Sequence, residues 1–212
     1  LFRSGISNTA SGACSFVGGG NNNTASGYNS TISGGCGHCA TAGYTTVSGG
    51  YRNCATSQGA TVAGGVVNIA SGYRSFIGSG TTNTASGCHS VITGGISNTA
   101  SGICSTIGGG GCNTSSNYAT TVGGGRCNTA NNVWATVAGG LVNTASGDAS
   151  TVGGGAGNTA SAYHSTVSGG NANTSTFRHA TVSGGLSNCA TSCAAFVGGG
   201  RQNTASGSHS FV

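Results

Sequence analysis

The chain has 212 residues, of which 44 are glycine and none is proline, and its only charged side chains are six arginines and Asp148. An ordinary globular domain has about a quarter of its residues charged, so this composition is not that of an ordinary globular domain. Collagen is excluded because glycine does not occur at every third position, and membrane insertion is not expected because no run approaches the roughly 20 apolar residues of a spanning helix.

A 15-residue repeat runs through the chain fourteen times without insertion or deletion. Its clearest copy is 143–157, NTASGDASTVGGGAG, and repeat positions are numbered here from 1 to 15 from its asparagine. Position 13 is always glycine, and position 10 is always valine or isoleucine. Position 1 is asparagine in every copy except one, where it is His38. A strict period of this kind is typical of a solenoid.

In chain order, the pattern predicts a strand near 8–11 and a second near 15–17, then strands near 23–26 and 30–32, and so on to 203–206 and 210–212. Side chains alternate between the two faces of a strand, so positions 1, 3, 8 and 10 are expected to point inward and positions 2, 4 and 9 outward. Position 5 and the glycines at positions 12 and 13 are expected to form the bends. The prediction is an all-β parallel β-solenoid, or β-roll, of fourteen repeats with two short strands per turn.

Two files of side chains are expected to hold the interior. One is the structural core at position 10: Val17, Ile32, Val47, Val62, Ile77, Ile92, Ile107, Val122, Val137, Val152, Val167, Val182 and Val197. The other is a ladder of stacked amides that share hydrogen bonds with one another: Asn8, Asn23, Asn53, Asn68, Asn83, Asn98, Asn113, Asn128, Asn143, Asn158, Asn173, Asn188 and Asn203. The uninterrupted repeat predicts one domain over residues 1–212, as a segment of a longer chain.

Ten cysteines in a chain with so little charge favour disulfides and an extracellular setting. Cys39 and Cys54 share position 2 on adjacent turns, and Cys112 and Cys127 share position 15. Stacking predicts that such pairs are close enough to bond. Cys88 and Cys104 form a third candidate pair, at neighbouring positions of adjacent turns. The alternative for each pair is that cysteine fills a variable bend position as a free thiol.

Catalysis, cofactors and metals are not expected. Catalysis by paired carboxylates needs two acidic groups, and the chain has Asp148 alone. The glycine triplets are followed by no G-K-S/T motif, which argues against a phosphate loop. The six arginines are scattered, so nucleic acid is not an expected partner. His164 and His179 share position 7 on adjacent turns, and the favoured interpretation is that they are solvated.

The unit Asn-Thr-Ala-Ser-Gly-x-x-Ser-Thr-Val-Gly-Gly-Gly resembles the head repeats of trimeric autotransporter adhesins and the similar repeats of tail-fibre-type proteins, over the whole chain. The matching positions are the alanine of position 3, the glycines of positions 5 and 12 and the serine of position 8. The resemblance implies a left-handed β-roll, a homotrimer and display on a cell surface or virion for attachment. The adhesin repeat usually has 14 residues, whereas this one has 15 and a double glycine.

The predicted function is therefore that of a structural surface fibre or adhesin head, which presents variable bends to a host surface or glycan and assembles as a trimer or filament. Four outward phenylalanines at position 9 are expected to contact a neighbouring chain: Phe16, Phe76, Phe196 and Phe211. The alternative is an ice-binding solenoid with an outward file of threonine at position 2: Thr9, Thr24, Thr84, Thr99, Thr114, Thr129, Thr144, Thr159, Thr174 and Thr204.

Overall fold

A computed structural model describes residues 5–212, and they fold as stacked turns of a parallel β-solenoid with two strands in each turn. No helix occurs within this range. The predicted all-β solenoid is therefore confirmed. Contacts divide the chain into two compact units, of which the first ends at Cys104 and the second comprises Ser105–Val212.

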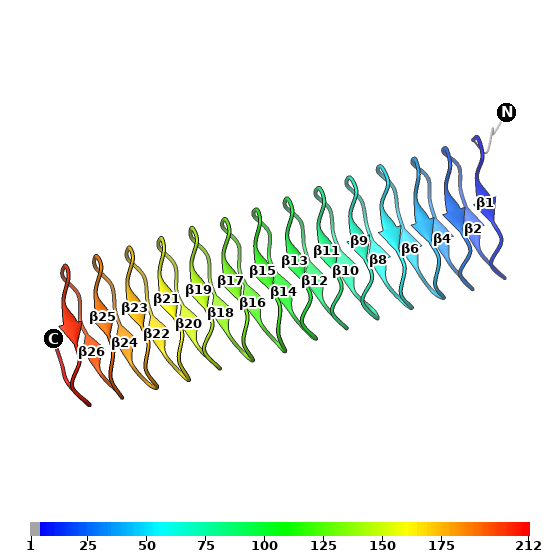
Figure 1. The fold of residues 1–212 in the computed structure, drawn as a ribbon. Coiled ribbons are helices and arrows are strands. Elements are labelled where there is room, and N and C mark those ends of the chain that lie inside the picture. Colours follow the sequence, from blue (N-terminus) through cyan, green and yellow to red (C-terminus); the bar gives the residue numbers. More distant parts are fainter. Residues whose placement is uncertain (1–4) are drawn as a thin grey trace. The chain divides into compact units, whose positions relative to one another are not determined.

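In the first unit, repeat positions 2 and 3 form one parallel sheet, here called the alanine sheet (Figure 1). Its strands, in spatial order, are β1 (Thr9–Ala10), β3 (Thr24–Ala25), β5 (Cys39–Ala40), β7 (Cys54–Ala55), β9 (Ile69–Ala70), β11 (Thr84–Ala85) and β13 (Thr99–Ala100). Positions 9 and 10 form a second parallel sheet, the valine sheet. It consists of β2 (Phe16–Val17), β4 (Thr31–Ile32), β6 (Thr46–Val47), β8 (Thr61–Val62), β10 (Phe76–Ile77) and β12 (Val91–Ile92).

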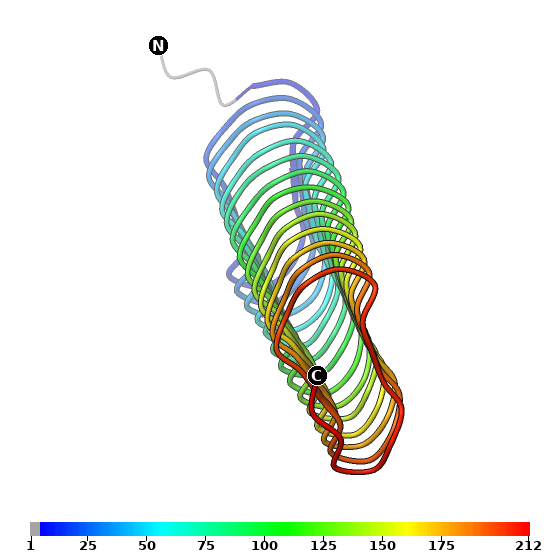
Figure 2. The same ribbon diagram turned by 90° about the vertical axis from the view of Figure 1, so that its left-hand side faces the viewer.

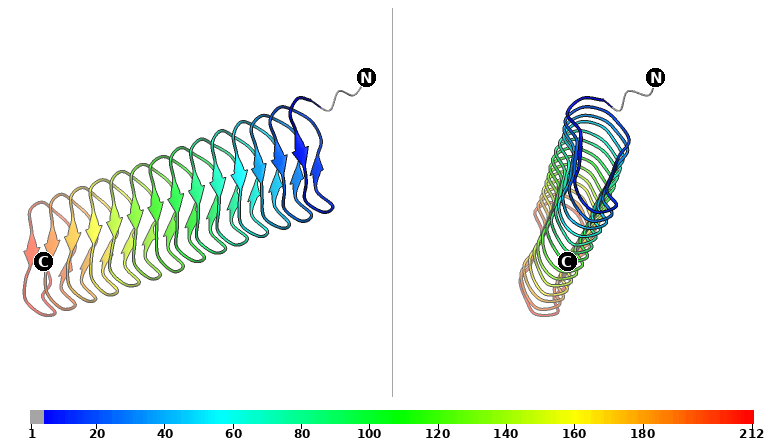
Figure 3. Two further views of the ribbon diagram at one scale, coloured as in Figure 1. Left: turned by 45° about the vertical axis from the view of Figure 1, so that its right-hand side comes forward. Right: turned by 90° about the vertical axis from the view of Figure 1, so that its right-hand side faces the viewer.

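The second unit has the same two sheets. Its alanine sheet consists of β15 (Thr114–Ser115), β17 (Thr129–Ala130), β19 (Thr144–Ala145), β21 (Thr159–Ala160), β23 (Thr174–Ser175), β25 (Cys189–Ala190) and β27 (Thr204–Ala205). Its valine sheet consists of β14 (Thr106–Ile107), β16 (Thr121–Val122), β18 (Thr136–Val137), β20 (Thr151–Val152), β22 (Thr166–Val167), β24 (Thr181–Val182) and β26 (Phe196–Val197). The arrows of both sheets are visible in Figure 3.

Strand pairing keeps the sequence register, so that each residue lies opposite the residue 15 positions later. Thr144 pairs with Thr159 in the alanine sheet, and Val152 pairs with Val167 in the valine sheet. A third line of parallel bridges runs along position 14, for example between Leu141 and Ala156. The sequence pattern did not predict this third line, because position 14 has no constant residue type.

The interior of each turn is narrow because the two sheets approach each other through small side chains. Viewed nearly along the stacking direction, the turns are flattened loops (Figure 2). The position-10 residues from Ile32 to Val197 are fully buried, and Val17 in the first described turn is half-buried. Most alanines of position 3 are also fully buried. One turn buries too little apolar surface to offset its ordering entropy, and stacking supplies the rest.

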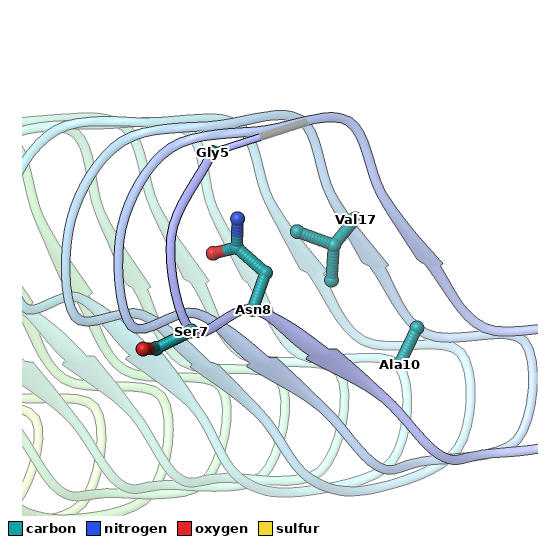
Figure 4. Close-up of a pocket in the computed structure, with 5 residues that line it drawn as sticks. All are labelled: Gly5, Ser7, Asn8, Ala10 and Val17. Atoms are coloured by element: carbon teal, nitrogen blue, oxygen red, sulfur yellow. The ribbon is translucent and has the colours of Figure 1, made fainter. Parts of the chain in front are cut away.

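The first described turn shows how the inward positions are arranged (Figure 4). Asn8, Ala10 and Val17 point into the space enclosed by the turn, whereas Ser7 points away from it. These residues and Gly5 line a pocket of about 320 Å³. In this turn Ala10 is exposed and Asn8 and Val17 are half-buried, whereas their equivalents in later turns are almost all fully buried.

The asparagines of position 1 do form a ladder, but their bonds differ from the expected ones. Oδ1 of Asn143 accepts a hydrogen bond from the backbone N–H of Asn158 at 2.9 Å. Its Nδ2 donates to the carbonyls of Gly139 and Gly155, both at 2.9 Å. The same three bonds recur at Asn128, Asn158, Asn173 and Asn188. Nδ2 of Asn83 also donates to Oδ1 of Asn68 at 3.1 Å, so the expected bond between stacked side-chain amides occurs at this step.

The ladder explains the invariant glycine of position 13. Gly185 has a φ of +91°, and a Cβ there would meet the carbonyl oxygen of Gly200 and the amide nitrogen of Asn188. The amide of each asparagine thus occupies the space that a side chain at position 13 would need. Position 12 is different, since a Cβ at Gly184 would meet nothing within 4 Å.

Each of the two bends of a turn contains one residue in the left-handed backbone conformation, and this residue is usually not glycine. Position 7 has φ near +55°, as in Tyr44 (+59°) and Trp134 (+54°), and position 15 does too, as in Val67 (+55°) and Val142 (+55°). The bend from position 5 to position 8 is closed by a hydrogen bond such as Ser150 N–H to the Gly147 carbonyl. A positive φ at the third residue is a feature of type II turns, where glycine is preferred. The repeat therefore places many ordinary side chains in a conformation that L-residues disfavour.

Candidate functional site

The two bends of the turn present different side chains. Positions 5–7 form what we call the aromatic edge. It presents Tyr28, Tyr44, Tyr73 and His89 in the first unit, and Tyr118, Trp134, Tyr163, His164, Phe177 and His179 in the second. Positions 14 and 15 form the aliphatic edge, with Ile6, Val66, Val67 and Ile96 in the first unit and Leu141, Val142 and Leu186 in the second. The variable positions of the repeat are thus exposed and grouped by chemistry.

Neighbouring rings contact one another along the aromatic edge of the first unit. Tyr28 packs edge-to-face against Tyr44 with 5.6 Å between ring centroids, and Tyr73 packs in the same way against His89 at 5.6 Å. The guanidinium of Arg74 lies 5.0 Å from the ring centroid of Tyr73. Such contacts hold the rings and the cation in fixed positions on an exposed surface.

A notch interrupts this row of side chains at Gly59, which is the one glycine at position 7 of the repeat. Its lining residues are Tyr44, Gln58, Gly59, Tyr73 and Arg74, and its volume is about 240 Å³. The sequence pattern was not used to predict the notch. A usable signal was present, because position 7 is occupied by Tyr44, Gly59 and Arg74 on three successive turns.

The aromatic edge of the second unit has its own cluster. The Tyr163 ring lies 4.0 Å from His164 and 5.8 Å from His179, and the two imidazoles are 5.5 Å apart. Arg178 lies 6.0 Å from the Tyr163 ring. One turn earlier, Oδ1 of Asp148 is buried without a hydrogen bond. Within residues 5–212 no group of three or more His, Cys, Asp or Glu side chains is arranged to hold a metal ion.

The outward threonines form continuous files on both sheets of the second unit. In the alanine sheet they run over five consecutive turns from Thr114 to Thr174, and in the valine sheet over six from Thr106 to Thr181. Their side chains are half-buried. In the first unit the files are interrupted, by Cys39, Cys54 and Ile69 in one sheet and by Phe76 and Val91 in the other.

Cys39 and Cys54 form a disulfide, with 4.5 Å between their Cα atoms. They lie opposite each other in the register of β5 and β7, which directs both side chains to the same side. The other two predicted pairs are not bonded, since Cys88, Cys104, Cys112 and Cys127 are free thiols. These four lie at positions 6, 7 and 15, on the bends of the turn.

His38 replaces asparagine in the ladder and keeps part of its role. Its N–H donates to Oδ1 of Asn23 at 3.0 Å, and its Nδ1 accepts from the N–H of Asn53 at 3.0 Å. The ring is buried, and Nε2 has no hydrogen bond of good geometry. Burial lowers the pKa of the His38 imidazole below its usual value of 6.5.

The position-9 phenylalanines are exposed to different degrees: Phe196 is half-buried, whereas Phe211 is 78% exposed. Each of the first three lies over the glycine two residues further on, since a Cβ at Gly18, Gly78 or Gly198 would meet the ring edge of Phe16, Phe76 or Phe196. Phe196 and Phe211 stack with their centroids 5.0 Å apart and an interplanar angle of 11°. Glycine at position 11 thus makes room for the ring on the same face of the sheet.

Comparison with models of known protein families and with curated proteins gave no match. In the part of the chain that is described, no helix has the length and apolarity to cross a membrane. The features that bear on function are therefore the two edges and the two threonine-bearing faces.

Proposed function

We propose that the chain is the structural part of a surface fibre or adhesin head, which assembles with copies of itself and presents its bends for attachment. The observation that carries the proposal is the separation of constant and variable residues. Positions 1, 3, 8 and 10 are nearly uniform and buried, whereas the variable positions 6, 7, 14 and 15 form the edges. Such a division suits a scaffold whose contacts can change without disturbing its fold.

Display outside the cell is part of the proposal. The Cys39–Cys54 disulfide supports it indirectly, because disulfides persist in oxidising compartments. A near absence of charged side chains supports a role without acid–base catalysis, since one carboxylate and five histidines give few catalytic groups. We propose no enzymatic step and no cofactor.

Self-assembly is the property to test first, by native mass spectrometry with and without reductant. We expect a trimer or an open-ended filament that survives reduction, because the proposed contacts are phenylalanines rather than inter-chain disulfides. Phe76→Thr, which introduces the usual residue of position 9, is expected to weaken assembly, whereas Phe177→Ser on the aromatic edge is not. A chain that is monomeric at all accessible concentrations would contradict the proposal.

Ice binding is the second candidate, and the threonine files of the second unit favour it. Parallel strands place the threonines about 4.8 Å apart along each file, which is a regular array of methyl and hydroxyl groups. The test is thermal hysteresis of a protein solution. Activity that is lost in Thr144→Lys but kept in Thr56→Lys would establish this function, and a solution that freezes without hysteresis would exclude it.

A further inference from the structure

We propose that the notch between Tyr44 and Tyr73 is a binding site for one acidic pyranose unit of a glycan, such as a uronic or sialic acid. The inference deepens the proposed function by naming the ligand class of the aromatic edge. It rests on the proposal that this edge makes the contacts.

The walls of the notch are two tyrosine rings from turns on either side of Gly59. Because turns stack in sequence order, Tyr28 supports Tyr44 from the side away from the notch, and His89 supports Tyr73 likewise. Tyr44 and Tyr73 remain 54% and 37% exposed. They are therefore held in place while part of each ring faces solvent. The C–H face of a pyranose carries partial positive charge and stacks on the negative face of an aromatic ring.

Two backbone donors at the floor of the notch are already bonded within the fold. The N–H of Gly59 donates to the Gly43 carbonyl at 3.0 Å, and the N–H of Arg74 donates to the Gln58 carbonyl at 2.9 Å. The polar side-chain groups that line the notch are the Gln58 amide, the tyrosine hydroxyls and the Arg74 guanidinium. These groups are spread over several side chains, and such a lining suits a ring that carries several hydroxyl groups.

Arg74 supplies the charge preference. The sequence from Leu1 to Cys104 contains no acidic side chain, so the guanidinium has no carboxylate partner there. Its stem lies over Gly59, since a Cβ at that glycine would be 3.0 Å from Cγ of Arg74. A guanidinium among the lining residues of a small pocket pairs readily with a carboxylate through two parallel hydrogen bonds.

The size of the notch limits the ligand to one ring. Its volume of about 240 Å³ is below the range of roughly 300 to 1,000 Å³ that holds a drug-sized ligand. Neighbouring sugars of a glycan would extend over the exposed bends on either side. We therefore expect weak binding of a single chain, which repeated copies in an assembly would strengthen.

The test is isothermal titration of the whole chain with three acidic glycans, namely trigalacturonate, a hyaluronan tetrasaccharide and sialyllactose. Maltotriose and inorganic sulfate serve as the neutral sugar and the bare anion. We expect at least one acidic glycan to bind, with maltotriose and sulfate each about tenfold weaker or undetectable, as loss of one charge-assisted contact or one stacking contact predicts. Absence of binding by all three glycans, or equal binding of sulfate, would overturn the proposal.

Matched variants locate the site. Arg74→Gln and Gly59→Asn, which fills the notch with a residue that accepts a positive φ, are expected to reduce binding about tenfold or more. The controls lie on the opposite edge, where Arg52 lies 5.1 Å from the Tyr51 ring and a Cβ at Gly37 would be 3.1 Å from Cγ of Arg52. Arg52→Gln and Gly37→Asn therefore make the same changes away from the notch and are expected to leave binding unchanged. Equal losses in both pairs would overturn the site.

Failure of this inference can be distinguished from failure of the proposed function. Native mass reports assembly in every variant, whether or not a glycan binds. A trimer or filament that binds none of the glycans would refute the notch as a site and leave the scaffold proposal standing.

Discussion

The side-chain carbonyl of Asn143 accepts a hydrogen bond from the backbone N–H of Asn158, one turn further along the chain. The amide nitrogen of Asn143 bonds the carbonyls of Gly139 in its own preceding bend and Gly155 in the next turn. One side chain thus satisfies three backbone groups that lie in the interior, where water cannot replace it. The constancy of position 1 follows from this geometry.

Asn143→Ala is expected to lower the free energy of unfolding by about 2 to 5 kcal/mol, because it leaves the Asn158 N–H and the Gly139 carbonyl buried without partners. Asn131→Ala is the control, since that asparagine is exposed at position 4. Urea denaturation followed by circular dichroism measures both. Similar midpoints for the two variants would show that the ladder does not stabilise the fold.

The glycines of positions 12 and 13 are expected to respond differently to alanine. Gly185→Ala combines a positive φ with a clash against the Gly200 carbonyl and the Asn188 amide, so we expect a loss of about 3 kcal/mol or more. Gly184→Ala meets open space and is expected to change stability by less than about 1 kcal/mol. Thermal melts of the two variants give the comparison, and equal effects would argue against the geometric explanation.

Val67→Asn is expected to stabilise the protein by about 0.5 to 1 kcal/mol, because asparagine accepts the left-handed conformation better than a β-branched residue does. The neighbouring Val66 is the matched control. Its exposure of 40% is close to the 37% of Val67, and it takes part in a parallel bridge instead. Val66→Asn is expected to destabilise slightly. Chemical denaturation of both variants tests the sign of each effect, and a stabilised Val66→Asn would contradict the argument.

His38 is expected to make stability depend on pH. Because burial lowers its pKa in the folded chain, the unfolded chain binds more protons between that pKa and about 6.5. The free energy of unfolding should therefore fall as the pH decreases through this window. Protonation of Nδ1 would also remove the acceptor of the Asn53 N–H.

Urea midpoints at pH 7.5 and pH 5 test this. His38→Asn restores the usual ladder residue and is expected to remove the loss of stability at the lower pH. His89→Asn, on the exposed bend, is expected to keep it. An unchanged pH dependence in His38→Asn would show that another group is responsible.

Much of the fold could be predicted from the residues alone. The spacing of Val152 and Val167 fixes which residues pair across turns, because a strict repeat without insertions allows one register. Alternation within each repeat, as in Thr144-Ala145, identifies the inward and outward faces, because side chains on a strand point to opposite sides. The residues of the core, the asparagine file and the threonine files follow from these two facts.

Other features were decided by the tertiary structure. The partners of the Asn143 amide depend on where the carbonyls of two different bends meet, and the left-handed conformation of Val67 occurs at a position that accepts almost any residue. Among the predicted cysteine pairs, Cys39 and Cys54 lie opposite each other in the strand register and are bonded, whereas Cys112 and Cys127 on the bends are free thiols. The notch at Gly59 exists because side chains from three successive turns surround one missing side chain. Each of these depends on distances between turns, which residue identity alone does not specify.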